Sequence, residues 1–99
     1  MEMNPEAYNM LPEHMRDAMR NYVEYGIEPG DFLRNVLCNN LFGALERADD
    51  VNKHRLWDYG LFLYNCAPSR CKGSPEAYKY WLSVGGMEGL NRARSDSDA

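Results

Sequence analysis

The sequence predicts an all-α fold, a compact bundle of four to five short helices. Apolar residues recur at helical spacing in several segments, and no alternation of apolar and polar residues continues for five residues, as a half-buried strand would require. Prolines preceded by capping side chains, as in Asn4-Pro5 and Ser74-Pro75, mark helix starts. Short amphipathic helices bury their apolar faces by packing on one another, which favours a bundle.

The first half of the chain begins with two proline-led starts. Asn4-Pro5-Glu6 supplies a cap, a proline at the first helical position and an acid near the positive end of the helix dipole. Residues 12–25 predict a second helix, and Gly26 supplies a left-handed stop after it. The apolar face of this helix consists of Met15, Ala18, Met19, Tyr22 and Val23.

The middle of the chain contains an apolar stripe that two asparagines interrupt. After the turn at residues 28–31, Asp31 caps a helix whose stripe is Leu33, Val36, Leu37, Leu41 and Leu45. Asn39 and Asn40 are poor helix formers. Either one helix covers residues 32–47 or two short helices meet here with Asn40 capping the second, and we favour the break.

Asp49 and Asp50 then cap a helix that continues to about Asn65. Its expected inward face is Leu56, Tyr59, Gly60 and Leu63. Trp57, Leu61 and Tyr64 spread apolar surface further around the same helix. A band this wide predicts either burial on two sides or a surface for self-association.

The last clear helix is expected over residues 75–84, with Tyr78, Trp81 and Leu82 on its inner face. Gly85-Gly86 ends it. The end of the chain, Arg-Ser-Asp-Ser-Asp-Ala, is small and polar. We therefore expect a single helical domain over residues 1–86 and a flexible C-terminal tail over residues 87–99.

Charge is unevenly distributed along the 99 residues. The formal net charge is −4, yet residues 1–50 contain ten acids against four bases and residues 51–79 contain five bases against two acids. An acidic protein is a poor ligand for bulk nucleic acid. No apolar run approaches the roughly 20 residues that span a bilayer, and the acidic start lacks the apolar block of a secretory signal. We expect a cytoplasmic protein.

The cysteines and histidines do not form a recognisable catalytic or metal-binding pattern. Cys66 and Cys71 are predicted to be free thiols beside a connection, and Cys38 a small buried hydrophobe. Arg70 and Lys72 flank Cys71 and are expected to lower the pKa of its thiol, but no base accompanies it. With only His14 and His54, a zinc site would need ligands from distant segments. We expect no enzyme and no cofactor, and a small cysteine or metal enzyme is the least favoured alternative.

The best candidate site is an anion-binding turn before the last predicted helix. Lys72-Gly73-Ser74 is expected to present unpaired backbone N–H groups and a hydroxyl at a helix start, with Arg70 adding a second cation. An aromatic side chain nearby would give a base something to stack on. The plain alternative is an ordinary capped helix with solvated cations. The predicted ligand-binding residues are Arg70, Lys72, Gly73, Ser74, Tyr64, Tyr78 and Trp81.

Several strings in this sequence, spread over roughly residues 11–86, carry a resemblance. They are Leu-Pro-Glu-His-Met at 11–15, Gly-Ile-Glu-Pro-Gly-Asp-Phe-Leu at 26–33, Asn-Asn-Leu at 39–41, Arg-Ala-Asp-Asp-Val-Asn at 47–52, Tyr-Asn-Cys-Ala-Pro at 64–68 and Gly-Ser-Pro at 73–75, together with Tyr22 and Trp81. The chain resembles a set of small accessory proteins of tailed phages and prophages. The resemblance implies a role in the host cytoplasm, as a host-takeover or counter-defence factor, and names no reaction.

Two functions follow from the candidate site and the resemblance. In the first, oligomers of the protein sequester a small anionic nucleotide signal of bacterial antiviral immunity, at a site that a neighbouring copy helps to complete. In the second, the acidic first half docks on a basic surface of a host defence complex or other host factor and blocks it, with the negative charge steering the encounter.

Overall fold

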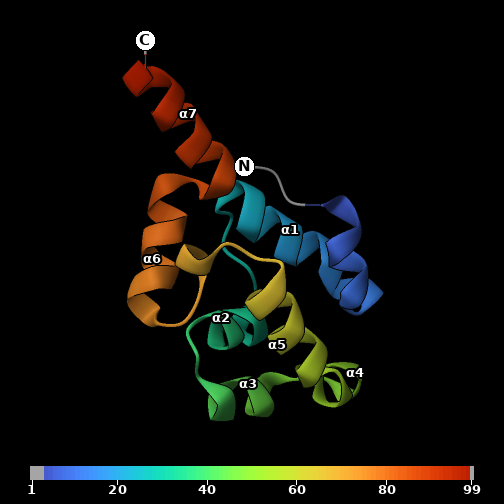
Figure 1. The fold of residues 1–99 in the computed structure, drawn as a ribbon. Coiled ribbons are helices and arrows are strands. Elements are labelled where there is room, and N and C mark those ends of the chain that lie inside the picture. Colours follow the sequence, from blue (N-terminus) through green and yellow to red (C-terminus); the bar gives the residue numbers. More distant parts are fainter. Residues whose placement is uncertain (1–3, 99) are drawn as a thin grey trace.

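The computed structural model describes the backbone of residues 4–98 and the side chains of residues 4–94, and this part of the chain is helical without strands. The all-α class is confirmed. The α-helices are α1 (Arg16–Tyr25), α2 (Asp31–Leu37), α3 (Leu41–Arg47), α4 (Asp50–His54), α5 (Leu56–Asn65), α6 (Pro75–Val84) and α7 (Gly86–Asp98). Short 3-10 helices precede α1 and α6, namely η1 (Pro5–Met10), η2 (Glu13–Met15) and η3 (Ser69–Cys71). In Figure 1, α3 and α4 lie at one end of the molecule and α7 projects from the other.

The core is built around α1. Met19, Tyr22 and Val23 of this helix are buried, as the stripe predicted. The indole N–H of Trp81 on α6 donates to the backbone carbonyls of Tyr22 and Val23, at 3.0 Å each. The Tyr22 hydroxyl donates to the carbonyl of Cys71 at 2.7 Å. These bonds fasten α6 and η3 to the centre of the molecule.

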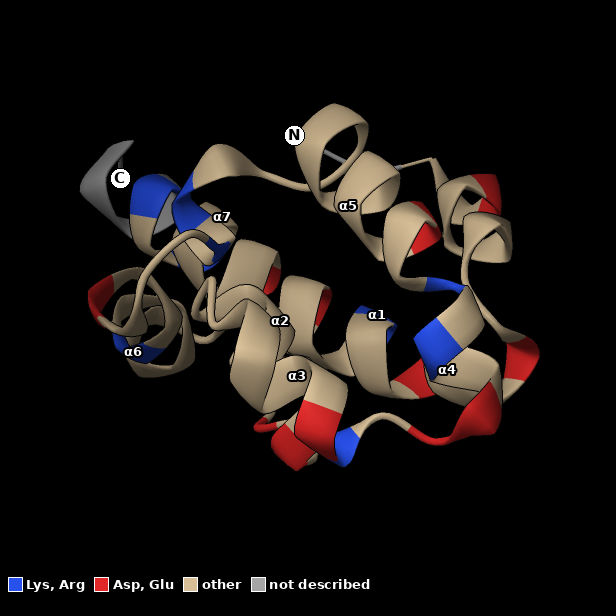
Figure 2. Cartoon of the chain, turned by 90° about the horizontal axis from the view of Figure 1, so that it is seen from below, with Lys and Arg blue, Asp and Glu red and all other residues tan. Residues whose placement is uncertain are grey.

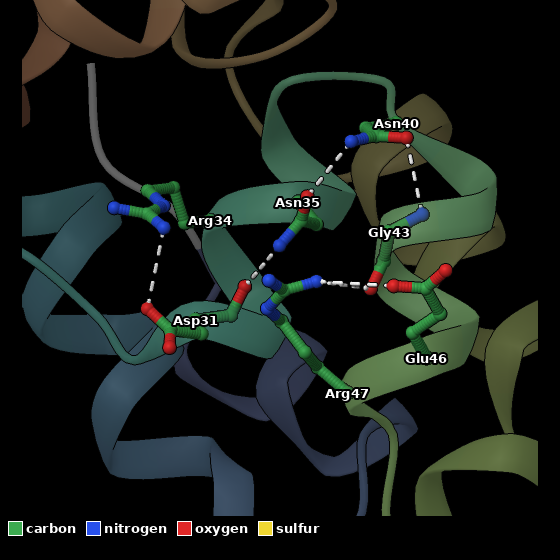
Figure 3. Close-up of polar contacts among 7 residues, drawn as sticks. All are labelled: Asp31, Arg34, Asn35, Asn40, Gly43, Glu46 and Arg47. Carbon is green, nitrogen blue, oxygen red and sulfur yellow. Dashed lines mark hydrogen bonds and ion pairs between the residues drawn. The ribbon is translucent and has the colours of Figure 1, made fainter.

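The break at the two asparagines is confirmed. Asn39 adopts a left-handed backbone (φ 65°), and the Asn40 side chain accepts a hydrogen bond from the Gly43 N–H at 3.1 Å, which caps α3. Asn40 also donates to Asn35, whose own amide donates to the Asp31 carbonyl on α2 (Figure 3). A Cβ at position 43 would overlap the Asn35 and Asn40 side chains, so a larger residue here would displace the two amides that bond across the junction.

The break also changes which side of α3 is buried. Gly43 and Ala44 pack inward, whereas Leu41 and Leu45, which the continuous stripe placed in the core, are exposed. The left-handed residue turns the chain between the two helices, so the stripe of α2 does not continue onto α3.

The helix expected from residue 50 to residue 65 is two helices, α4 and α5, separated at Arg55. The Arg55 guanidinium donates to the Met10 carbonyl of η1 at 2.9 Å and pairs with Asp58. Tyr59 and Leu63 are buried as expected, but Phe62 is buried as well and Gly60 is exposed. Contact of α5 with η1 therefore sets the inward face of α5.

The C-terminal segment is helical. The sequence predicts a flexible tail over residues 87–99, whereas the structure places residues 87–98 in α7 (Gly86–Asp98), which contacts both α1 and α6, and residue 99 lies outside the described residues. Gly85 and Gly86 have left-handed backbones (φ 80° and 67°), and a Cβ on Gly86 would lie 2.5 Å from the Gly26 nitrogen. The glycine pair makes a sharp turn and permits backbone contact with the end of α1, so a second helix follows where an end was expected.

Candidate functional site

The predicted site residues lie around two separate hollows. One, the α3–α5 hollow, has a volume of about 400 Å³ and includes Tyr64, Lys72 and Gly73 in its lining. The other, the α7 hollow, has a volume of about 340 Å³ and includes Arg70 and Trp81. Ser74 and Tyr78 line neither. The structure therefore divides what the sequence suggested was one site.

The polar groups of the Lys72-Gly73-Ser74 turn are engaged inside the protein. The Gly73 N–H, expected to be unpaired, donates to the Leu37 carbonyl in the last turn of α2 at 2.8 Å. The Ser74 hydroxyl accepts from the Ala77 N–H at 3.0 Å and caps α6, and the Lys72 ammonium donates to the Pro68 carbonyl at 3.3 Å. The turn holds α2, η3 and α6 together, which corrects the expectation of free N–H groups at Gly73.

Two of the expected stacking residues belong to the core. Trp81 is 1% exposed and Tyr78 is 5% exposed. The Tyr78 ring stacks on Tyr22 with their centroids 5.5 Å apart, and the Trp81 indole is fixed by its two hydrogen bonds. Neither ring offers an open face to a base, although Trp81 contributes to the floor of the α7 hollow. Tyr64, by contrast, is 85% exposed at the α3–α5 hollow.

The Cys71 thiol is buried and unreactive in character. Burial raises the pKa of Cys71 to about 11, and the nearby Lys72 ammonium offsets only part of that rise. The expectation that neighbouring cations lower this pKa is therefore wrong, because desolvation of the thiolate outweighs their attraction. Burial also raises the pKa of Cys38. Cys66 is half-buried, with its Sγ 3.7 Å from the Met10 Sδ.

The α7 hollow places two arginines beside an apolar floor. Its lining consists of Pro68, Ser69, Arg70, Trp81, Met87, Leu90, Asn91 and Arg94. Within the described side chains, neither Arg70 nor Arg94 has an ion-pair or hydrogen-bond partner, whereas Arg16, Arg20, Arg34, Arg47 and Arg55 are all engaged with carbonyls or carboxylates. Figure 2 shows Lys and Arg positions on and beside α7, whereas positions of both charges lie around α3 and α4.

Arg94 is the site residue that sequence reasoning missed. Met87, Leu90, Asn91 and Arg94 are spaced i, i+3, i+4 and i+7, which is the signature of one helix face. This spacing alone does not predict a helix here, because a Gly-Gly pair and a small, polar C-terminus are typical of the end of ordered structure. Met87 is buried and Leu90 is partly buried, so this face anchors α7.

The α3–α5 hollow is apolar with a polar lip. Its walls consist of Val36, Leu41, Ala44, Leu56, Tyr59, Gly60, Leu63 and Tyr64, and its lip of Asn39, Asn40, Lys72 and Gly73. Large apolar side chains stand exposed on the two helices that border it. Phe42 on α3 and Trp57 on α5 are each 77% exposed.

Comparison of the chain with protein-family models, with curated proteins and with solved structures found no match. In the part of the chain searched, which is the described one, no three His, Cys, Asp or Glu side chains are placed to share a metal ion. None of the described helices is both long enough and apolar enough to cross a bilayer.

Proposed function

We propose that this protein is a non-enzymatic binding protein that takes up a small anionic nucleotide-type ligand in the α7 hollow. In the phage context that the resemblance implies, such uptake would counter bacterial defence by sequestering a nucleotide immune signal. The observation that carries the proposal is the pair Arg70 and Arg94, two guanidinium groups that have no partner among the described side chains and that line a hollow with an apolar floor.

The chemistry of the hollow suits a phosphate attached to an apolar or aromatic body. Guanidinium groups bind phosphate oxygens through paired, charge-assisted hydrogen bonds. Such bonds contribute on the order of 1.5–3 kcal/mol each. Burial of a base against Met87 and Leu90 adds the apolar part. A Kd of about 1 µM corresponds to roughly −8 kcal/mol, which these contacts reach only if both arginines take part.

Sequestration also agrees with the state of the other groups near the site. The Cys71 thiol is buried with a raised pKa, and the Ser74 hydroxyl caps α6. Neither is available as a nucleophile. A protein that removes a signal by binding needs only affinity and abundance, so this arrangement suffices without a reacting group.

The proposal is tested by calorimetric titration with cyclic dinucleotides, ADP-ribose derivatives, ATP and inorganic pyrophosphate. At least one nucleotide is expected to bind, and Arg70→Glu and Arg94→Glu are each expected to abolish the binding. Arg92→Glu is the matched control, because Arg92 is exposed on the same helix and does not line the hollow. The absence of binding by every compound tested would contradict a defined site. So would a loss of affinity in Arg92→Glu as large as that in Arg70→Glu or Arg94→Glu. Mass spectrometry of small molecules that co-purify from defence-active cells would then identify the natural ligand.

The competing function is a protein inhibitor that docks through its acidic first half. Several of those acids are engaged within the fold. Glu24 accepts a hydrogen bond from the Tyr8 hydroxyl at 2.9 Å, and Asp31 pairs with Arg34 at 3.3 Å. Glu28 is exposed and has no ion pair among the described residues. Capture of a host factor that is lost with Glu28→Lys, together with a flat nucleotide panel, would favour this function over the first.

A further inference from the structure

The outer side of α5 carries an apolar stripe that the fold leaves uncovered. Trp57, Gly60, Leu61 and Tyr64 are spaced i, i+3, i+4 and i+7, so they share one side of the helix. Trp57 is 77% exposed, Tyr64 is 85% exposed and Gly60 is exposed between them. The other side of α5, with Tyr59, Phe62 and Leu63, is buried in the core. A helix that is apolar nearly all round is typical of one that is covered on both sides.

Helix α3 extends this surface across the α3–α5 hollow. Leu41 lines the hollow from α3, and Phe42 and Leu45 are exposed on the same helix. The network of Figure 3 holds α3 firmly against α2, because Asn40 bonds both Gly43 and Asn35. The surface therefore combines projecting aromatic rings with an adjacent apolar hollow of about 400 Å³. We call Leu41, Phe42, Leu45, Trp57, Gly60, Leu61 and Tyr64 the α3–α5 face.

Gly60 lowers the stability of helix α5, and the packing within a single copy of the protein does not require a glycine there. A glycine inside a helix is less favourable than an alanine, because its backbone loses more conformational freedom on folding. A Cβ at Gly60 would meet nothing within 4 Å in this structure, and the residue lies within a regular helix. Its own fold therefore has room for a larger residue. A missing side chain in the middle of an exposed apolar stripe suits close approach by another backbone from outside.

We propose that the α3–α5 face is a homodimer interface, in which α5 crosses α5 of a second copy near Gly60. Projecting rings and a hollow lie side by side on this face, so a two-fold axis lets Tyr64 or Trp57 of each copy fill the hollow of the other. The charge of α5 also suits a second copy. Asp58 is the only ionisable acid or base in Leu56–Asn65 apart from the tyrosines, and Arg55 neutralises it. A crossing of α5 on α5 therefore brings no unpaired charge of this helix against its partner.

The area of the face is sufficient for a stable dimer. A large aromatic side chain buries about 150–250 Å² when it is fully covered. Phe42, Trp57 and Tyr64, at their observed exposure, therefore offer on the order of 350–600 Å² per copy. The exposed Leu41 and Leu45 add to this, which brings the face to the lower part of the size range of specific interfaces, about 600 Å² per partner. The face shares no residue with the lining of the α7 hollow, so dimerisation and ligand uptake are separable.

The test is the mass of the full chain in solution, measured by light scattering and sedimentation at about 100 µM, well above a micromolar Kd. A mass of twice the 11.4 kDa protomer is expected. The double variant Trp57→Glu, Tyr64→Glu is expected to be monomeric. Ile27→Glu is the control, since Ile27 is a large apolar side chain, 53% exposed, that lies outside the face, and it is expected to remain dimeric. A monomeric wild type, a dimeric double variant or an equally dissociated control would overturn the proposal.

Gly60→Ala keeps the test decisive if the double variant fails to fold. The added methyl group meets nothing in the protomer. The helix content of the monomer and its stability in urea are therefore expected to be unchanged or higher. At the helix crossing the same methyl separates the two backbones, so dimer affinity is expected to fall at least tenfold. Unchanged dimer affinity in Gly60→Ala would rule out a crossing at this residue and, with it, the proposed interface.

Discussion

The turn at Lys72-Gly73-Ser74 and the arginine two residues before it are made of similar chemistry but serve different purposes. In the turn, the Gly73 N–H, the Ser74 hydroxyl and the Lys72 ammonium all bond to groups of the same chain. Arg70 bonds to none of the described residues and lines a hollow with Arg94, which is 24 positions further along. The residue types of a segment can predict that it binds an anion. Polar groups that already form hydrogen bonds within the protein are not available to a ligand, however, and only the structure shows which groups these are.

The largest effect is expected from Gly86→Ala, which disturbs the start of α7, the helix that carries Arg94. The new Cβ would lie 2.5 Å from the Gly26 nitrogen, on a residue whose backbone is left-handed. We expect a loss of about 2–4 kcal/mol in the free energy of unfolding, because strain and backbone overlap add. Urea denaturation measures it. A loss below about 0.5 kcal/mol, the range of ordinary surface changes, would show that α7 does not depend on this close approach.

Next in size is the loss of ligand affinity when either arginine is neutralised. Arg70→Gln and Arg94→Gln are each expected to weaken nucleotide binding about tenfold or more, since a charge-assisted bond is removed. Lys72→Gln is the matched change in the turn and is expected to leave the Kd within about twofold, because its ammonium already bonds to Pro68. Titrations of the three variants under the same conditions show which cations contact the ligand. A larger loss of affinity in Lys72→Gln than in Arg70→Gln would place the binding site at the turn and not at the α7 hollow.

Ser74→Ala is expected to have a moderate effect on stability and none on binding. The variant loses the hydroxyl that caps α6, which costs about 1 kcal/mol. For a domain of this size, that corresponds to a drop of about 4–8 °C in Tm. Calorimetry gives the Tm, and titration with the best nucleotide gives the Kd. A changed Kd at unchanged Tm would assign Ser74 to the site and not to the scaffold.

The smallest effect at neutral pH is expected from the Cys71 thiol. Its pKa is raised to about 11 in the folded protein from an ordinary value of 9.0, because the thiolate would be buried. The stabilisation from keeping this thiol neutral is complete below pH 9 and is lost as the pH rises through 11, since only the unfolded chain releases the proton at the lower pH. Cys71→Ala is therefore expected to lessen the fall in stability between pH 9 and pH 11.

A thiol-reactive probe provides a second measurement at Cys71. Cys66, which is half-buried, is expected to react with it in the folded protein, whereas Cys71 reacts only after unfolding. Rapid labelling of Cys71 at pH 7.5 in the folded state would contradict both its burial and its raised pKa.

The α2–α3 junction illustrates what local sequence information predicts and what it does not. Two consecutive poor helix formers predicted the break, and Asn40 caps α3 as proposed. The exposure of Leu41 and Leu45 was not predicted, because a stripe defines a face only relative to its own helix axis. Once Asn39 turns the chain, the burial of that face depends on where the new axis lies against α2.

Local patterns predict the helical class, most helix starts and the inner faces of α1 and α6, because caps, prolines and 3.6-residue periodicity act within a few residues of one another. The remaining features arise from contacts between distant segments. Tertiary structure turned the tail into α7 through contact between Gly86 and Gly26, brought Arg94 to the same hollow as Arg70, and engaged the Gly73 N–H with Leu37. Each of these depends on residues far apart in the chain, whose distances no local pattern specifies.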